Sequence, residues 1–215
     1  MDRKIYCISG LGADHRMFQK LSIEGTQLVP VPWPPFDKHD GLVCYAQKVA
    51  AAITDTDPTI IGLSFGGMIA TEIAKMMKVK QTFLVSSAKF NMELGNTSGI
   101  LSLLIKGGLL PYSFLKKPNK IIFDRFGAKT EEDKALLTAV LNDTDSAFLR
   151  WAFKAILEWQ NSVRPERLIH IHGTSDKIIA SENVQPDYWV KDGGHLMVYN
   201  HAMAVSTVIQ DNLIH

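Results

Sequence analysis

Short apolar runs and longer amphipathic stretches alternate along most of the chain. The short runs have the length and composition of buried strands, and the stretches between them have the apolar spacing of helices. Strands that alternate with helices predict βαβ units and a parallel sheet. The predicted strands are residues 4–9, 27–31, 59–61, 81–85, 168–172 and 187–190. The predicted helices between and after them are residues 16–21, 42–53, 68–77 and 198–209.

The alternation is absent between residues 86 and 165, where the regular patterns are helical only. Thr130-Glu131-Glu132-Asp133 resembles a capping box, and Asp145 can cap the helix that follows it. We interpret residues 86–165 as a helical cap, inserted into a core of residues 1–85 and 166–215. The apolar faces of these two helices are predicted at Leu136, Leu137, Val140 and Leu141, and at Phe148, Trp151, Ala152, Ala155, Ile156 and Trp159.

Composition narrows the class of protein. The chain has 215 residues, of which 46% are hydrophobic, and this suits one domain that carries an insertion. Its formal net charge of +1 argues against partners such as nucleic acid or an anionic membrane. The sequence contains no apolar segment of membrane-spanning length and no secretory leader, so we expect a soluble, cytoplasmic protein. Composition does not indicate an oligomeric state.

The two cysteines, Cys7 and Cys44, lack the spacing of a metal site or a redox pair. Cys7 falls in a predicted strand and Cys44 in a predicted helix, so we expect both to be small buried residues. The cysteines therefore indicate neither a metal site nor a redox pair. The expected partner is a small-molecule substrate, as the motifs described next imply.

The motif with the most specific chemistry is Gly62-Leu63-Ser64-Phe65-Gly66, which fits the pattern G-x-S-x-G. It directly follows a predicted buried strand and opens a predicted helix. This context favours a nucleophile elbow, a strained turn that presents the hydroxyl of Ser64 above the sheet. Gly62 and Gly66 leave room for that turn. The alternative is a glycine-rich turn that binds phosphate or simply packs tightly.

A serine hydroxyl needs a base that accepts its proton, and His195 is the strongest candidate for this role with Ser64. It follows the last predicted strand in a Gly-Gly-His loop, which can bring an imidazole to the edge of the sheet. His15 and His172 are the alternatives. His170 and His172 lie within a predicted strand, a position that favours a structural role.

The base needs a carboxylate that holds it in the correct tautomer, and Asp176 is the strongest candidate. It lies shortly after the predicted strand 168–172, although Ser175-Asp176 is also ordinary turn chemistry. Asp187 and Asp192 are weaker rivals, because they adjoin the strand that delivers the histidine. The chain order serine, aspartate, histidine is the order known for nucleophile-elbow enzymes.

An oxyanion hole requires two backbone N–H groups that point at the developing negative charge. Phe65, directly after the proposed nucleophile, is expected to supply one. Leu11, which follows Ser9-Gly10 after the first strand, is expected to supply the other. The alternative for Gly10-Leu11-Gly12 is a plain tight turn.

Four segments together resemble the α/β-hydrolase family: residues 9–12, 62–67, 172–176 and 193–195. The resemblance covers essentially the whole chain. It implies a mostly parallel, twisted sheet with helices on both faces and a helical cap. It also implies hydrolysis of carboxylic esters or thioesters without a cofactor, although some members are lyases, perhydrolases or non-catalytic binders.

The chain departs from the family pattern in two ways. It has Ser9-Gly10 where members often have His-Gly, and it begins at a strand that resembles the family's third, which predicts a small sheet. We expect a serine hydrolase for a small, largely apolar acyl group, contacted by Leu104, Leu110 and Phe114 of the cap. The alternatives are a lyase or C–C bond hydrolase on the same fold, and a non-catalytic small-molecule receptor.

Overall fold

A six-stranded parallel sheet forms the centre of the protein in the computed structural model, which describes residues 3–95 and 119–214. The strand order is β2-β1-β3-β4-β5-β6. The register aligns Cys7 with Ile61, Ile61 with Phe83, and Phe83 with Ile169 across four neighbouring strands. The strands fall on the six predicted runs: β1 (Arg3–Ile8), β2 (Thr26–Pro30), β3 (Thr59–Leu63), β4 (Gln81–Val85), β5 (Leu168–Gly173) and β6 (Tyr188–Val190).

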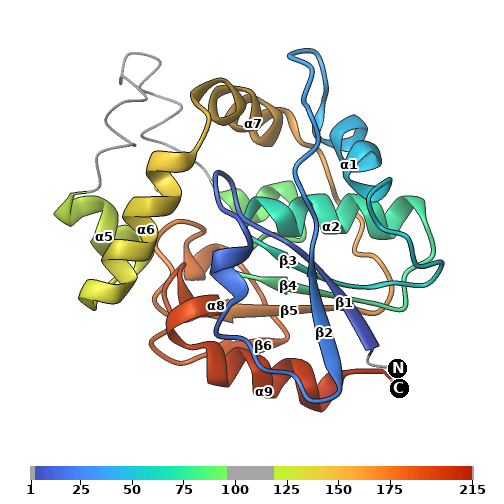
Figure 1. Cartoon of the computed structure of the whole chain (residues 1–215). Helices are drawn as coiled ribbons and strands as arrows, with labels where there is room; N and C mark the ends of the chain where they lie inside the picture. The colour runs from blue at the N-terminus through green and yellow to red at the C-terminus, as the bar shows by residue number, and fades with distance from the viewer. Residues whose placement is uncertain (1–2, 96–118, 215) are drawn as a thin grey trace.

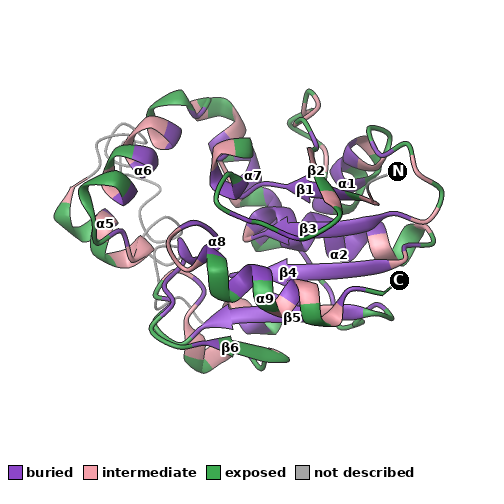
Figure 2. Ribbon diagram, turned by 60° about the horizontal axis from the view of Figure 1, so that its bottom comes forward, coloured by how far each residue is buried: buried purple, intermediate pink, exposed green. Residues whose placement is uncertain are grey.

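Helices cover both faces of this sheet, because alternate side chains of a strand point to opposite faces. Ile5 and Cys7 of β1 belong to one apolar cluster, and Tyr6 and Ile8 belong to the other. The first cluster includes α8 (Met197–Asn200) and α9 (Ala202–Asn212), and the second includes α1 (Leu42–Ala50) and α2 (Phe65–Met76). Figure 2 shows the central strands β3, β4 and β5 as buried, the edge strand β6 as largely exposed, and exposed residues on the outer sides of the helices. The predicted fold class, a mostly parallel sheet with helices on both faces, is confirmed.

The regular elements that the structure describes between β4 and β5 are helical, and α5 and α6 lie beyond one end of the strands (Figure 1). Thr130 and Asp133 form the predicted capping box, and the Asp145 carboxylate accepts a hydrogen bond from the Phe148 N–H at 2.7 Å. The division into a core and a cap at residues 86 and 165 stays a prediction. The helices of this region are α5 (Lys120–Phe126), α6 (Glu131–Asp143) and α7 (Ser146–Glu158).

Three local features differ from the sequence analysis. α5 was not predicted, because it spans two turns; Asn119 caps its start and Gly127, with φ of 72°, ends it. The predicted last helix is two helices, which separate where His201 leaves the helical conformation. The predicted helix at residues 16–21 is a single 3₁₀ turn, η1 (His15–Phe18), capped by Asp14.

The expectation that both cysteines are buried is wrong for one of them. Cys7 is buried in β1, but Cys44 is exposed, and its thiol lies 3.3 Å from the Asp40 carboxylate. The reason is helical geometry, because the buried side of α1 carries Leu42, Tyr45, Ala46 and Val49, which leaves position 44 on the opposite side.

Within the described ranges, no helix combines the length and the apolar character that a membrane crossing requires.

Candidate active site

Ser64 occupies the sharp turn between β3 and α2, with φ of 52° and ψ of −119°. Residues with side chains rarely adopt this region, and holding one there costs about 1–3 kcal/mol. Tight packing maintains the turn: a Cβ on Gly62 would collide with Gly66 and Gly67, and one on Gly66 would collide with the end of β1. The hydroxyl of Ser87 also donates to the Ser64 carbonyl oxygen at 2.7 Å. These contacts present the Ser64 side chain, half-buried, at the carboxyl end of the strand.

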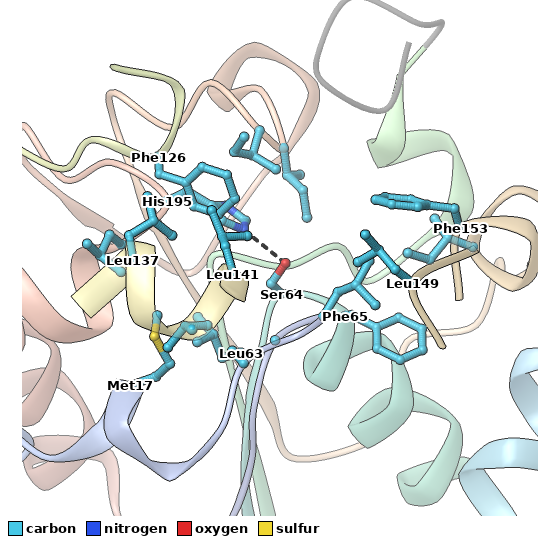
Figure 3. Close-up of a pocket in the computed structure, with 18 of the residues that line it drawn as sticks. Met17, Leu63, Ser64, Phe65, Phe126, Leu137, Leu141, Leu149, Phe153 and His195 are labelled. Atoms are coloured by element: carbon cyan, nitrogen blue, oxygen red, sulfur yellow. Dashed lines mark hydrogen bonds between the residues drawn. The ribbon is translucent and has the colours of Figure 1, made fainter. Parts of the chain in front are cut away.

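His195 lies in the loop between β6 and α8 and joins Ser64 to Asp176. Its Nε2 atom is 2.9 Å from the Ser64 Oγ atom, and its Nδ1 atom is 2.9 Å from the Asp176 Oδ2 atom. Figure 3 shows the first of these bonds as a dashed line, with the Phe126 ring beside His195. A carboxylate only accepts hydrogen bonds, so Nδ1 carries the proton and Nε2 is free to accept from the serine hydroxyl. This is the tautomer that a general base requires.

Asp176 is 2% exposed, and backbone groups orient its carboxylate. The Oδ1 atom accepts hydrogen bonds from the N–H groups of Ile178 and Ile179, at 2.8 and 3.1 Å. The Oδ2 atom is thereby directed at His195. A buried carboxylate with partners on both oxygens can hold an imidazole in one orientation.

The rival candidates lie elsewhere. His15 belongs to η1, and its side chain is 69% exposed. Asp187 is engaged by Arg164 and by the His170 N–H, and Asp192 is exposed. His172 is buried within β5, where its nearest acidic group is Asp176 itself. The structure therefore brings together Ser64, Asp176 and His195 and keeps His15, Asp187 and Asp192 out of this hydrogen-bonded chain.

Leu11 and Phe65, the expected oxyanion-hole residues, flank Ser64 and line the same pocket. Phe65 is the first residue of α2, so its N–H has no acceptor within the helix. The loop that carries Leu11 approaches closely, because a Cβ on Gly10 would lie 3.5 Å from the Ser64 Cβ atom. An oxyanion hole needs two such N–H groups, and the assignment of this role to Leu11 and Phe65 stays a prediction.

An apolar pocket opens above Ser64 (Figure 3). Among the described residues that line it, Ser64 and His195 are the two with polar side chains. Helices α6 and α7 form much of its wall, with Leu137, Val140, Leu141, Leu149 and Phe153. The predicted substrate contacts Leu104, Leu110 and Phe114 lie outside the described residues.

Sequence reasoning missed the role of α7 in this wall. Leu149, Phe153 and Ile156 are spaced by four and three residues, so they form a stripe along the helix that faces the pocket. The predicted apolar face included Ile156, which lines the pocket, but also Phe148 and Trp151, which pack instead into an aromatic cluster with Trp33, Phe36, Tyr45 and Phe65. The spacing of Leu149, Phe153 and Ile156 was the signal in the sequence that could have identified this part of the pocket wall.

Among residues 3–95 and 119–214, no three His, Cys, Asp or Glu side chains gather as they would around a metal ion. No family model and no curated protein sequence matches the chain.

Solved structures match it over nearly its whole length at low sequence identity. It is similar to a lipase-esterase related protein from Clostridium acetobutylicum, at 15% identity and a TM-score of 0.71, covering 99% of this chain and 95% of that one. An N-acyl homoserine lactonase in complex with N-butanoyl homoserine matches at 14% identity and a TM-score of 0.73, covering 100% of this chain and 91% of that one. A bromoperoxidase from Bacillus anthracis matches at 14% identity and a TM-score of 0.73, covering 99% of this chain and 92% of that one.

These likenesses, together with the parallel sheet and its helices, define the class of the molecule: the chain has the α/β-hydrolase fold. The fold that the four sequence segments predicted is therefore confirmed.

Proposed function

We propose that the protein is a serine hydrolase that cleaves a carboxylic ester or thioester of a small, largely apolar acyl substrate through an acyl-enzyme. The observation that carries the proposal is the hydrogen-bonded chain Ser64–His195–Asp176, whose serine opens into an apolar pocket. Its fold is shared with enzymes described as esterase-related, lactonase and lipase, which supports hydrolysis.

In the proposed mechanism, Ser64 attacks the acyl carbonyl while His195 Nε2 takes the hydroxyl proton. The N–H groups of Leu11 and Phe65 stabilise the negative oxygen of the tetrahedral intermediate. His195 then donates its proton to the leaving group, which departs and leaves the acyl group on Ser64. Water, activated by the same imidazole, releases the acid. Asp176 holds the ring throughout and stabilises its charged form.

The pocket wall supports the choice of acyl group. No charged side chain is found among the described residues that line it. A carboxylate or ammonium group on the substrate would lose its hydration there without gaining a partner, which costs several kcal/mol. An uncharged, apolar acyl chain needs no charged or polar partner and gains the burial of its methylenes, about 0.8 kcal/mol each.

The test combines a substrate series with active-site labelling. p-Nitrophenyl esters of graded chain length and acyl-CoA thioesters are assayed side by side, and a fluorophosphonate probe is reacted with the protein and with Ser64→Ala. We expect ester or thioester turnover, labelling that maps to Ser64, and no labelling of the variant. A lyase would turn over its substrate without accumulating an acyl group on Ser64, and a receptor would bind without turnover; either result overturns the proposal.

A further inference from the structure

A chain of buried polar side chains continues from the proposed acid into the protein, on a path that does not involve Ser64. His170 and His172 of β5 are fully buried, and Lys89 and Glu93 are 3% and 7% exposed. Burying this many polar groups is costly unless each is paired. The chain is therefore a feature that needs an explanation beyond packing.

The hydrogen bonds of this chain all run in one direction. The Nε2 atom of His172 is 3.0 Å from the Ile179 carbonyl oxygen, which only accepts, so this nitrogen carries the proton. The Nδ1 atom of His172 must then accept, and it lies 3.2 Å from the Nε2 atom of His170. The Nδ1 atom of His170 in turn accepts from the Lys89 ammonium group at 3.3 Å. The Ile179 carbonyl group and the Lys89 ammonium group, at the two ends of this chain, therefore determine the tautomers of both histidines.

Lys89 anchors the far end of the chain. Its ammonium group forms hydrogen bonds with the His170 Nδ1 atom and the Gln185 carbonyl oxygen, and an ion pair with the Glu93 Oε1 atom at 3.2 Å. The Oε2 atom of Glu93 accepts from the backbone N–H of Lys89 at 2.6 Å and of Phe90 at 3.3 Å. Two hydrogen bonds and one ion pair therefore orient the ammonium group.

Both histidines are neutral under ordinary conditions. Burial lowers the pKa of His170 well below 6.5, and the neighbouring His172 and Lys89 lower it further. Burial also lowers the pKa of His172, against the attraction of Asp176. The other charged or titratable groups that act on the two rings are Arg164, Glu93 and His195.

The near end of the chain meets the acid. The His172 Nε2 atom lies 3.5 Å from the Asp176 Oδ2 atom, the same oxygen that accepts from His195. The His172 N–H is donated to the Ile179 carbonyl oxygen, so the protonated, partly positive edge of the ring lies beside the carboxylate without a direct hydrogen bond to it. Fixed dipoles of this kind stabilise a buried negative charge.

We propose that His172, held in one tautomer by His170 and Lys89, is a positioning residue for Asp176: the partly positive edge of its ring, 3.5 Å from the Oδ2 atom, stabilises the negative charge on the oxygen that orients His195. This inference rests on the proposed function, which assigns Asp176 its role. A merely structural role would consist of filling the core and tying residues 89–93 to β5.

The experiment measures the charge balance of the site in His172→Phe, which keeps a flat ring but removes its dipole, and in His172→Gln, which keeps an N–H donor. Without the dipole the carboxylate is a stronger acceptor, so protonated His195 is favoured. We expect the acidic limb of the pH profile of kcat/KM to move to higher pH by about half a unit in the Phe variant, and to return toward the native position in the Gln variant. Ile5→Val, a core change away from the chain, is the matched control for lost stability and should leave the limb in place.

NMR titration of the His195 imidazole in the free protein separates this inference from the proposed function. Its midpoint should rise in His172→Phe by the same amount whether or not any ester is cleaved. A shifted titration without esterase activity would overturn the function and support the inference. Normal turnover with an unmoved limb and midpoint would overturn the inference, even if the melting temperature falls. If His172→Phe does not fold, the double variant Lys89→Met/Glu93→Gln removes the anchor and should give a smaller rise; no rise would overturn the inference.

Discussion

Asp176 has a histidine on each side: the Nδ1 atom of His195 lies 2.9 Å from its Oδ2 atom, and the Nε2 atom of His172 lies 3.5 Å from the same oxygen. The two rings differ in what their second nitrogen meets. That of His195 faces Ser64 at the floor of the pocket, whereas that of His172 faces His170 inside the sheet.

The backbone accounts for the difference. His195 is in a loop beyond the carboxyl end of β6, where side chains reach the site, as is usual for parallel sheets. His172 is in β5, where helices and neighbouring strands bury it completely. The same side chain beside the same carboxylate can thus act on a substrate in one position and support the acid in the other.

The largest effect on kcat is expected when His195 and His172 are compared by mutating each of them. Ser64→Ala and His195→Ala should each lower kcat by about 10⁴-fold or more, because nucleophile and base act as a unit. His172→Phe should cost about tenfold, the size of loss that outer partners of a site typically cause. The measurement is the steady-state kcat of the three variants, with circular dichroism to verify that each is folded. Equal losses for His172→Phe and His195→Ala would erase the distinction.

Removing the shared carboxylate should affect both histidines. Asp176→Asn is expected to lower kcat by about 10⁴-fold, since the amide permits the wrong tautomer of His195. Asp187→Asn and Asp192→Asn are matched controls, because both residues are exposed and neither bonds His195 in the described structure. Their kcat should stay near the native value. If either control proved worse than Asp176→Asn while folded, the acid would be misassigned.

A smaller effect, on acyl chain-length preference, is expected from changes in the pocket wall above Ser64. Phe153 lines the pocket, whereas Phe148, on the same helix and equally half-buried, packs against Trp33 and Phe65. Phe153→Ala should change the relative kcat/KM across acyl chain lengths by about tenfold, since one methylene in an apolar pocket is worth about 1–3 kcal/mol. Phe148→Ala should lower the melting temperature and leave the chain-length profile flat. Identical profiles for the two variants would show that the α7 stripe does not select substrates.

The smallest effect concerns stability against pH. His170 and His172 have lowered pKa values in the folded protein, so they stay neutral there while the unfolded chain protonates below pH 6.5. Their contribution to stability is complete above pH 6.5 and is lost as the pH falls below it. Urea unfolding between pH 8 and 5 should show this decline, and His172→Gln should reduce its slope by up to about 1.4 kcal/mol per pH unit. An unchanged slope would mean that folding does not lower the pKa of His172.

Local patterns were sufficient for much of the fold. The central strands β3, β4 and β5 are short apolar runs that the sheet buries, and Thr130 and Asp145 cap helices through contacts within three residues. The glycines around Ser64 mark a turn that side chains would block. Ser64, Asp176 and His195 could be singled out because each follows a strand, and parallel strands end at one edge. Their catalytic roles stay a proposal.

What the sequence by itself determined is therefore the set of elements and the residues at the carboxyl ends of strands, since these depend on neighbours along the chain. The tertiary structure alone decided which side of α7 lines the pocket, why Cys44 is exposed, and that Lys89 meets His170 across 81 positions of sequence. Each of these depends on contacts between segments far apart in the chain. Apolar spacing shows that a helix has a face to bury, but only the tertiary structure shows which neighbour that face packs against. A buried lysine can be recognised only when its three partners are seen around it.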